Sequence, residues 1–219
     1  MPNPGRHSRV NLHEALVKPS FDHAVICTYT FDPLFFENYC LEKFSSLSHA
    51  NISILTDRST YLKAIRCSGT NRPRLVNLRY LLHPIDVNRR FHPKLFLFTA
   101  QKTGRLIVGS ANFTRSGLTT NAEVVDVFDF ALDKEETTLP LFQEAIGFLA
   151  ALAGRWQCQS LASNLAALQR NTPWLHTKVD RSSSTPRLIH NLQRSLCADS
   201  GEGNSHSDRM SIKIGAQRR

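Results

Sequence analysis

The residues best suited to chemistry lie close together, in the segment 91–123 (FHPKLFLFTAQKTGRLIVGSANFTRSGLTTNAE). His92 and Lys94 are two residues apart, so on an extended segment both side chains point to the same face. Ser110 and Asn112 have the same spacing after a short polar turn. We therefore expect an imidazole, an ammonium, a hydroxyl and a carboxamide to gather on one face of a sheet.

This set of groups suits displacement at phosphorus. A free imidazole has a pKa of about 6.5, so a large fraction of it is neutral and nucleophilic at pH 7. The carboxylate of Glu123, which opens the next apolar stretch, could orient His92 and stabilise its charged form. Lys94 would offset the negative charge of phosphate oxygens, and Ser110 and Asn112 would donate hydrogen bonds to them. Because no carboxylate cluster for a divalent cation accompanies these residues, we expect no metal and no cofactor.

The same segment resembles the HKD motif of the phospholipase D superfamily, which is written H-x-K-x(4)-D and is followed by G-S-x-N. His92-Pro93-Lys94 matches the first part and the residues 109–112 (GSAN) match the second. The later Asn121-Ala122-Glu123 is similar to the Asn-x-Glu of PLD-like nucleases and of helicase- or restriction-associated phosphodiesterases. The resemblance implies a PLD-like α-β-α sandwich, in the form of one half of the usual two-motif arrangement.

One position departs from the family pattern. The aspartate of the motif should lie five residues after Lys94, and this chain has Thr99 there. In family terms Glu123 would then take over the orienting role. Gly109, which opens the second part of the motif, is expected to let the backbone come close to a ligand.

The resemblance also implies a mechanism in which His92 attacks phosphorus and forms a phosphohistidine. A second histidine, from a second copy of the motif, would protonate the leaving oxygen and then activate water. This chain has one copy, because the His-x-Lys spacing at 176–178 is not followed by G-S-x-N. The second half-site must therefore come from a homodimer partner or from a missing second PLD domain. Helicase or restriction-system proteins are further expected partners.

Positive charge is concentrated around the same motif. The segment 58–115 has 12 basic residues and one acidic residue, in a chain with a formal net charge of +9. Arg89 and Arg90 directly precede the His-x-Lys pattern, and Arg115 directly follows the second half of the motif. We expect these three arginines to bind substrate phosphates and favour a nucleic acid as substrate. The alternative is that the basic residues are solvated strand ends and turns.

The elements that must position these residues alternate between strands and helices, which predicts an α/β fold with a mixed central sheet. Asp32 and Pro33 have the residue types of an N-cap and a first helical position. A short polar turn between two apolar runs predicts a β-hairpin at 94–109. The expected strands are 23–30, 51–55, 74–82, 94–99, 105–109 and 122–132, and the expected helices are 34–44, 59–65, 139–156 and 161–168.

The sequence divides into three parts. We expect an N-terminal extension at 1–20, a PLD-like catalytic domain at 21–172, and a linker with a disordered or truncated tail at 173–219. Trp174 falls in the expected linker and has no assigned role, while the segment 187–196 looks like the start of another structured unit. We hypothesise that the chain is truncated or frame-shifted relative to a longer parent.

Composition narrows the class of protein further. Apolar residues make up 41% and charged residues 21% of the 219 residues, which is typical of a globular domain. The five cysteines are scattered, without a C-x-x-C pair, and are interpreted as reduced structural thiols. The N-terminal residues 1–10 lack the apolar region of a secretory signal, and no apolar run reaches the length of a membrane span. We therefore expect a cytoplasmic protein without membrane insertion.

These observations lead to one preferred function and two alternatives. The preferred function is a metal-independent phosphodiesterase of PLD type, a DNA-directed nuclease. The first alternative is a catalytically incomplete fragment that binds nucleic acid without turnover. The second alternative is a phospholipid phosphodiesterase or phosphatidyl transferase. The substrate class and the oligomeric state stay open at this point.

Overall fold

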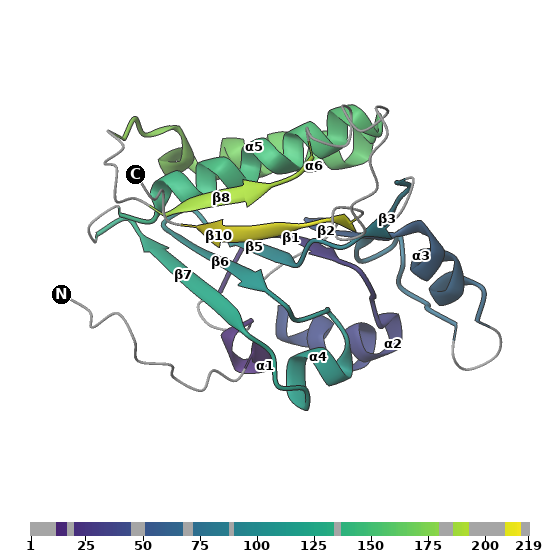
Figure 1. Ribbon diagram of the computed structural model, residues 1–219. Coiled ribbons are helices and arrows are strands. Elements are labelled where there is room, and N and C mark those ends of the chain that lie inside the picture. The colour runs from purple at the N-terminus through teal and green to yellow at the C-terminus, as the bar shows by residue number, and fades with distance from the viewer. Residues whose placement is uncertain are drawn as a thin grey trace.

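The structure is a computed structural model that describes residues 12–16, 20–44, 51–67, 72–87, 90–133, 137–179, 186–192 and 209–215. Within these ranges a six-stranded sheet has the order β3-β2-β1-β5-β6-β7 (Figure 1). Its strands are β1 (His23–Thr28), β2 (Ile52–Asp57), β3 (Leu81–Ile85), β5 (Leu95–Thr99), β6 (Thr103–Gly109) and β7 (Val125–Ala131). The predicted α/β class with a mixed sheet is confirmed.

Strand direction determines which chain segments meet at each edge of this sheet. The strand β1 pairs in parallel with β2, and β2 pairs in parallel with β3. The strands β5, β6 and β7 are each antiparallel to the preceding neighbour. Consequently one edge of the sheet contains the carboxyl ends of β1, β2, β3 and β6. The amino ends of β5 and β7 lie at the same edge. The predicted hairpin at 94–109 is confirmed by the pairing of β5 with β6.

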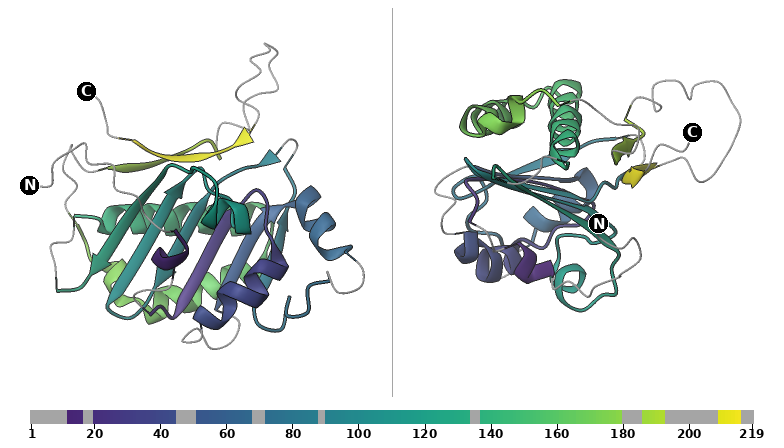
Figure 2. Two further views of the ribbon diagram at one scale, coloured as in Figure 1. Left: turned by 90° about the horizontal axis from the view of Figure 1, so that it is seen from below. Right: turned by 90° about the vertical axis from the view of Figure 1, so that its left-hand side faces the viewer.

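Helices cover both faces of the sheet, as Figure 2 shows. The helices α5 (Leu139–Arg155) and α6 (Gln159–Asn171) lie on one face. The short helices α1 (Leu12–Ala15), α2 (Pro33–Phe35) and α4 (Arg115–Thr119) lie on the other. Side chains of β5 alternate between the two layers, with Leu95 and Leu97 in the core under α5 and Phe96 and Phe98 in the second core. A strand buried on both faces reads as a continuous apolar run, which explains the sequence KLFLFT.

The predicted helix at 34–44 is helical throughout but irregular. Asp32 accepts a hydrogen bond from the amide of Phe35 at 3.0 Å, so the predicted N-cap is confirmed. After α2 the chain continues as a π-helix, η1 (Phe36–Cys40), and a 3-10 helix, η2 (Leu41–Phe44). The other predicted helices appear as α3 (Arg58–Ile65), α5 and α6, with ends shifted by a few residues.

The predicted third strand at 74–82 is wrong over most of its length. The strand β3 covers Leu81–Ile85 instead, and the preceding residues form a turn with Asn77 at a φ of 62°. The carboxylate of Glu37 holds this turn, because it accepts hydrogen bonds from the amides of Arg74 and Leu75 at 2.9 Å each. The alternating pattern at 74–80 therefore reflects contacts of a turn with η1 and not the pleat of a strand.

Trp174 belongs to the core and not to a linker. It lies in the 3-10 helix η4 (Pro173–His176), and 2% of its surface is exposed. Its ring stacks on Phe130 at a centroid distance of 4.0 Å and contacts Phe142 edge-on at 5.3 Å. Its indole nitrogen donates to the carbonyl of Ala100 at 3.0 Å. Sequence patterns did not predict that Trp174 is buried, because its partners lie on elements that are distant along the chain.

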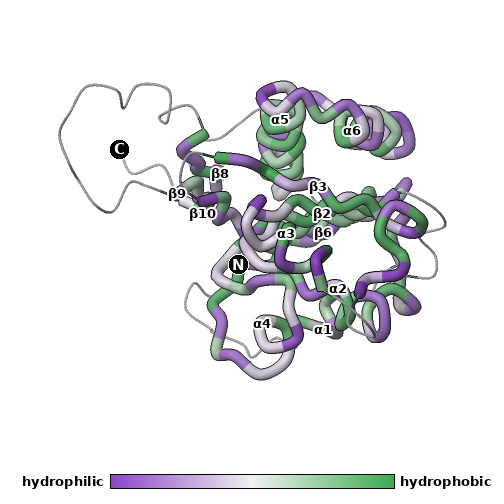
Figure 3. The backbone as a smooth tube through the Cα atoms, turned by 90° about the vertical axis from the view of Figure 1, so that its right-hand side faces the viewer, coloured by the Kyte–Doolittle hydropathy of each residue, from purple (hydrophilic) through white to green (hydrophobic). Residues whose placement is uncertain are grey.

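The expectation of a tail without structure is wrong for residues 209–215. The strands β8 (Arg187–His190) and β10 (Ile212–Gly215) form an antiparallel pair, and β9 (Arg209–Met210) pairs in parallel with β4 (Arg90–Phe91). Figure 3 shows β8, β9 and β10 together beside the sheet. Leu188, Met210 and Ile212 are buried in the core under α5. The segment that begins at Arg187 therefore packs on the same domain, because these few apolar residues extend an existing core.

Part of the predicted N-terminal extension also packs on the domain. Leu12, the first residue of α1, and Leu16, which directly follows α1, are buried in the core on the α2 side of the sheet. Among the helices of the described ranges, none has the length and apolar character needed to cross a bilayer.

Candidate active site

His92 and Lys94 lie at the sheet edge where β1 and β6 end, in the short link between β4 and β5. The Lys94 Nζ atom is 2.7 Å from Nδ1 and 3.0 Å from Nε2 of His92. Lys94 is buried and His92 is half-buried. The ammonium lies close to both ring nitrogens of His92. The predicted proximity of the two side chains is therefore present in the structure.

Tyr29 is a site residue that the sequence analysis missed. Its ring lies 5.0 Å from the ring of His92, centroid to centroid. The guanidinium of Arg90 and the ammonium of Lys94 each lie 5.9 Å from the tyrosine ring centre. Tyr29 directly follows β1, whose carboxyl end meets this edge. Its position near the end of a predicted buried strand is visible in the sequence. Only the order of the strands in the sheet shows that this position lies beside His92.

Two distant segments hold the backbone on either side of His92. The amide of Phe91 donates to Oδ2 of Asp57 at 3.0 Å, and the amide of His92 donates to the carbonyl of Met210 at 3.0 Å. Asp57 is buried and caps α3 through a second bond, from the amide of Ser59 to Oδ1 at 2.9 Å. The irregular link that carries His92 is thus fixed between β9 and the first turn of α3.

Ser110 and Glu123 form a second contact pair. The hydroxyl of Ser110 donates to Oε2 of Glu123 and accepts a bond from the amide of Val124 at 3.0 Å. The side-chain amide of Asn121 donates to Oε1 of Glu123 at 3.2 Å. The carboxylate of Glu123 is therefore held by Ser110 and Asn121, two polar residues of the predicted motif. Whether it orients His92 stays a prediction.

Gly109 is needed for the packing of two strands. A Cβ atom at this position would lie 2.7 Å from the Cα atom of Val125 on β7. Glycine is therefore required by the close approach of the neighbouring strand, and an approach of the backbone to a ligand stays a prediction. The amide of Gly109 also donates to the carbonyl of Lys94 at 3.3 Å, which joins the two halves of the motif.

Asn112 lies against the end of β1. Its Oδ1 atom accepts hydrogen bonds from the amide of Thr30 at 3.3 Å and from the hydroxyl of Thr28 at 3.4 Å. The same hydroxyl accepts a bond from the amide of Phe113 at 2.9 Å. These bonds occupy the carboxamide oxygen, so the group that Asn112 can offer to a substrate oxygen is its Nδ2 donor.

The three predicted phosphate-binding arginines have different outcomes. Arg90 is exposed and lies over Tyr29, next to His92. Arg115 is exposed and lies over the ring of Tyr39, at 5.8 Å from its centre. Arg89 lies outside the described residues. Binding of phosphate by these side chains stays a prediction.

Thr99, at the position of the missing aspartate, lies at the far end of β5 from Lys94. Five residues of extended chain span about 17 Å, so Thr99 cannot contact the imidazole of His92. It is fully buried and accepts a hydrogen bond from the hydroxyl of Thr172 at 3.3 Å. The departure from the motif therefore affects the packing of β5 on the end of α6 and leaves the catalytic candidates in place.

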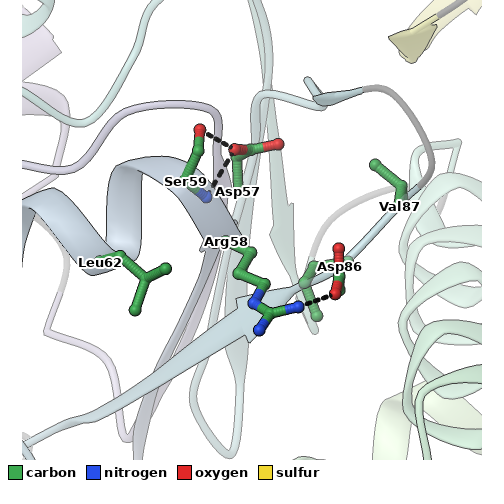
Figure 4. A pocket seen from close by; sticks show the side chains of 7 residues that line it. Asp57, Arg58, Ser59, Leu62, Asp86 and Val87 are labelled. Carbon is green, nitrogen blue, oxygen red and sulfur yellow. Dashed lines mark hydrogen bonds and ion pairs between the residues drawn. The ribbon is translucent and has the colours of Figure 1, made fainter.

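A polar hollow of about 230 Å³ lies at the same edge of the sheet (Figure 4). It is lined by Asp57, Arg58, Ser59, Leu62, Ile85, Asp86 and Val87. Figure 4 shows Ser59 turned toward Asp57 and Arg58 turned toward Asp86, with which it forms an ion pair. Asp57 connects this hollow to the link that carries His92, through its bond to Phe91.

Solved structures with the same arrangement of elements include a yeast DNA-processing enzyme. A mutant of yeast tyrosyl-DNA phosphodiesterase superimposes with a TM-score of 0.54 and 14% sequence identity, over 83% of this chain and 39% of the other. Another structure of the yeast enzyme gives a TM-score of 0.51 and 12% identity, over 84% and 41%. This chain therefore shares its fold with the yeast enzyme. It spans about two fifths of the length of that enzyme.

The other comparisons add little to this result. NucT from Helicobacter pylori matches 56% of this chain and 76% of its own with 12% identity, at a TM-score of 0.34 that is too low to support an argument. No family model matches the sequence, and neither does any curated protein. The comparisons with solved structures therefore show the fold of this chain.

Proposed function

We propose that this chain is a metal-independent phosphodiesterase of PLD type that acts on DNA and uses His92 as its nucleophile. The observation that carries the proposal is the 2.7 Å contact between Lys94 Nζ and His92 Nδ1 on a phospholipase D-like fold. It places the imidazole of His92 next to a compact positive charge. That combination suits attack on a phosphodiester, because the ammonium can stabilise the negative oxygens of the transition state.

In the proposed reaction a ring nitrogen of His92 attacks phosphorus, and the bond from phosphorus to the leaving oxygen breaks. A second histidine gives its proton to that oxygen. In the following step this second histidine takes a proton from water, the water oxygen attacks phosphorus, and His92 leaves. Lys94 and Nδ2 of Asn112 would stabilise the phosphate oxygens in both steps, and the Ser110–Glu123 pair would hold the edge of the site.

The second histidine has to come from another copy of this motif, either in a homodimer partner or in a further PLD domain. The chain spans about two fifths of the yeast enzyme and contains one His-x-Lys followed by G-S-x-N. Association with helicase or restriction-system proteins, and a cytoplasmic location, stay predictions. The same single motif favours the second candidate function, a catalytically incomplete fragment that binds nucleic acid without turnover.

Three observations support DNA as the substrate. Arg90 and Tyr29 lie directly beside His92, where a guanidinium can contact the phosphate that follows the scissile one. The segment 58–115, which contains the site, carries 12 basic residues and one acidic residue. The name of the yeast neighbour, tyrosyl-DNA phosphodiesterase, also fits a DNA substrate. The alternative is a phospholipid substrate. It is tested by measuring hydrolysis of phospholipid vesicles in place of DNA.

The test is hydrolysis of plasmid and single-stranded DNA in the presence of EDTA, combined with light scattering to determine the mass in solution. We expect the wild-type chain to cleave as a dimer and His92→Ala to lose cleavage while keeping its thermal unfolding midpoint. His176→Ala is the matched control, because His176 is exposed and shares the His-x-Lys spacing without the rest of the motif. EDTA-resistant cleavage by His92→Ala at the wild-type rate would refute the proposal, and binding without cleavage by a dimer would favour the second candidate.

A further inference from the structure

Two tyrosines each have an arginine over the ring. Tyr29 has Arg90 at 5.9 Å and Tyr39 has Arg115 at 5.8 Å. The ring of Tyr29 lies beside His92 and belongs to the site described above. Tyr39 has no role assigned there, although 53% of its surface is exposed. An exposed aromatic ring beside a cation is the combination with which proteins bind the bases of a single strand.

The Tyr39–Arg115 pair is close to the proposed reaction centre. Arg115 comes three residues after Asn112, and three residues span at most about 11 Å. The chain between them is fixed, because Thr114 caps α4 through the amide of Gly117 at 3.1 Å. The carbonyl of Phe113 also accepts a bond from the amide of Asp32 at 3.2 Å. The pair therefore lies within reach of a nucleotide next to the scissile phosphate.

The Tyr39 ring is held in place by the helical segment that carries it. Phe35 stacks on it at a centroid distance of 5.7 Å and an interplanar angle of 27°. Phe36 and Cys40, which flank it along η1, are buried in the core. Figure 1 shows α2 and α4 on the face of the sheet opposite α5, and the Tyr39 side chain next to α2 is exposed. A ring that is already fixed loses little conformational freedom when a base stacks on it.

A base can take the place of the guanidinium on the ring. An exposed cation–π contact raises the equilibrium constant for contact over separation by about two- to fivefold. Stacking of a nucleobase on an aromatic side chain is worth about five- to 150-fold. The base is therefore the stronger partner, and the displaced Arg115 becomes available to the adjoining phosphate.

We propose that Tyr39 and Arg115 form a base-stacking site for a nucleotide that neighbours the scissile phosphate in single-stranded nucleic acid. Tyr39 would accept the base on its ring, and Arg115 would move from the ring to the phosphate. The assignment of the flanking position rests on the proposed function, whereas the stacking itself does not need turnover.

The test compares two ligands of equal charge. Fluorescence anisotropy would measure the affinity for a labelled oligothymidylate and for an abasic oligonucleotide of the same length, which keeps the phosphates and lacks the bases. We expect wild-type protein to prefer the oligothymidylate, Tyr39→Ala to lose about fivefold or more of that preference, and Tyr39→Phe to retain it. Arg115→Ala should weaken binding of both ligands, with a smaller dependence on salt.

Leu132→Ala is the matched control, because 51% of Leu132 is exposed and it follows the opposite end of β7. An unchanged preference in a folded Tyr39→Ala variant, or an equal loss in Leu132→Ala, would overturn the inference. Hydrolysis of methyl p-nitrophenyl phosphate, which has no base, separates this result from a failure of the proposed function. If His92 is the nucleophile, that activity depends on His92 and is the same in Tyr39→Ala and wild-type protein.

Discussion

The backbone amide of His92 donates a hydrogen bond to the carbonyl of Met210 at a distance of 3.0 Å. This bond continues the parallel pairing of β4 with β9. On the other side, the amide of Phe91 is bound by Asp57. The nucleophile of the proposed reaction is therefore positioned by residues that come from the second strand of the sheet and from near the end of the chain.

The two carboxylate oxygens of Asp57 should have different functions, one in turnover and the other in stability. Its Oδ1 atom caps α3 and its Oδ2 atom holds Phe91. Asp57→Asn keeps one acceptor oxygen and is a good N-cap residue, so it should retain stability and lower kcat with little change in KM. Asp57→Ala should lower kcat and also reduce the free energy of unfolding by about 2 kcal/mol. Urea unfolding and steady-state kinetics measure the two effects, and a wild-type kcat for Asp57→Asn would contradict the positioning role.

Lys94 should be required as a compact charge. Lys94→Gln keeps hydrogen-bonding ability and removes the charge, so we expect kcat to fall by about 10²- to 10³-fold. Lys94→Arg should not restore activity, because the side chain is buried against His92 and a guanidinium is larger and planar. Lys102→Gln is the control, since Lys102 is exposed in the turn at the other end of the hairpin. Activity of Lys94→Gln within a few fold of wild type would show that the charge does not act on the transition state.

Ser110 and Glu123 should behave as one unit. Their side chains are hydrogen-bonded to each other, so removing either one leaves the other without this contact. We expect Ser110→Ala and Glu123→Gln each to lower kcat/KM by about tenfold, and the double variant to lose little more than either single variant. A double-mutant cycle on DNA cleavage measures this coupling. Strictly additive losses would mean that the two residues act separately, with Glu123 acting on His92 or on the substrate.

His83 should make the fold sensitive to acid. Burial lowers its pKa to about 4, and its ring lies 3.3 Å from the sulfur of Cys158 and 3.4 Å from the hydroxyl of Ser53. Between pH 6.5 and 4 the unfolded chain then binds more protons than the folded chain, so stability rises with pH in this window and is lost as pH falls through it. The loss from this residue is about 3 kcal/mol.

The measurement for His83 is urea unfolding at a series of pH values. In His83→Gln the slope of stability against pH between 4 and 6.5 should become flatter, because the titrating group is absent. The exposed His176→Ala serves as the control and should keep the wild-type slope. An unchanged slope in His83→Gln would assign the acid sensitivity to other groups, such as His23 and His190, whose pKa values are also lowered by burial.

Local patterns were sufficient for several parts of the fold. The cap at Asp32 and the hairpin of β5 with β6 depend on residues that are neighbours in the chain, so periodicity and turn composition predicted them. The spacing of His92 and Lys94 likewise predicted their contact, because two residues along an extended segment share a face. The hydrogen bond between Ser110 and Glu123 was not predicted, because it requires β6 and β7 to be neighbours in the sheet.

Other features depended on contacts between distant segments. Tyr29 and Asp57 reach the site because β1 and β2 are parallel and end at the same edge as the start of β5. Met210 reaches the site because β9 pairs with β4. Each of these strands has two residues, which is too short to produce a periodic pattern in the sequence. Trp174 looks like a linker residue until Phe130 and Phe142 are placed around it.

The sequence by itself therefore determined the chemical groups of the candidate site, their local spacing and the α/β class, since each depends on neighbours along the chain. The tertiary structure decided which backbone holds His92, why Gly109 must be glycine and which aromatic rings line the site. These features depend on strand order and register, and the order of distant strands follows from packing of the whole core rather than from any single stretch of residues.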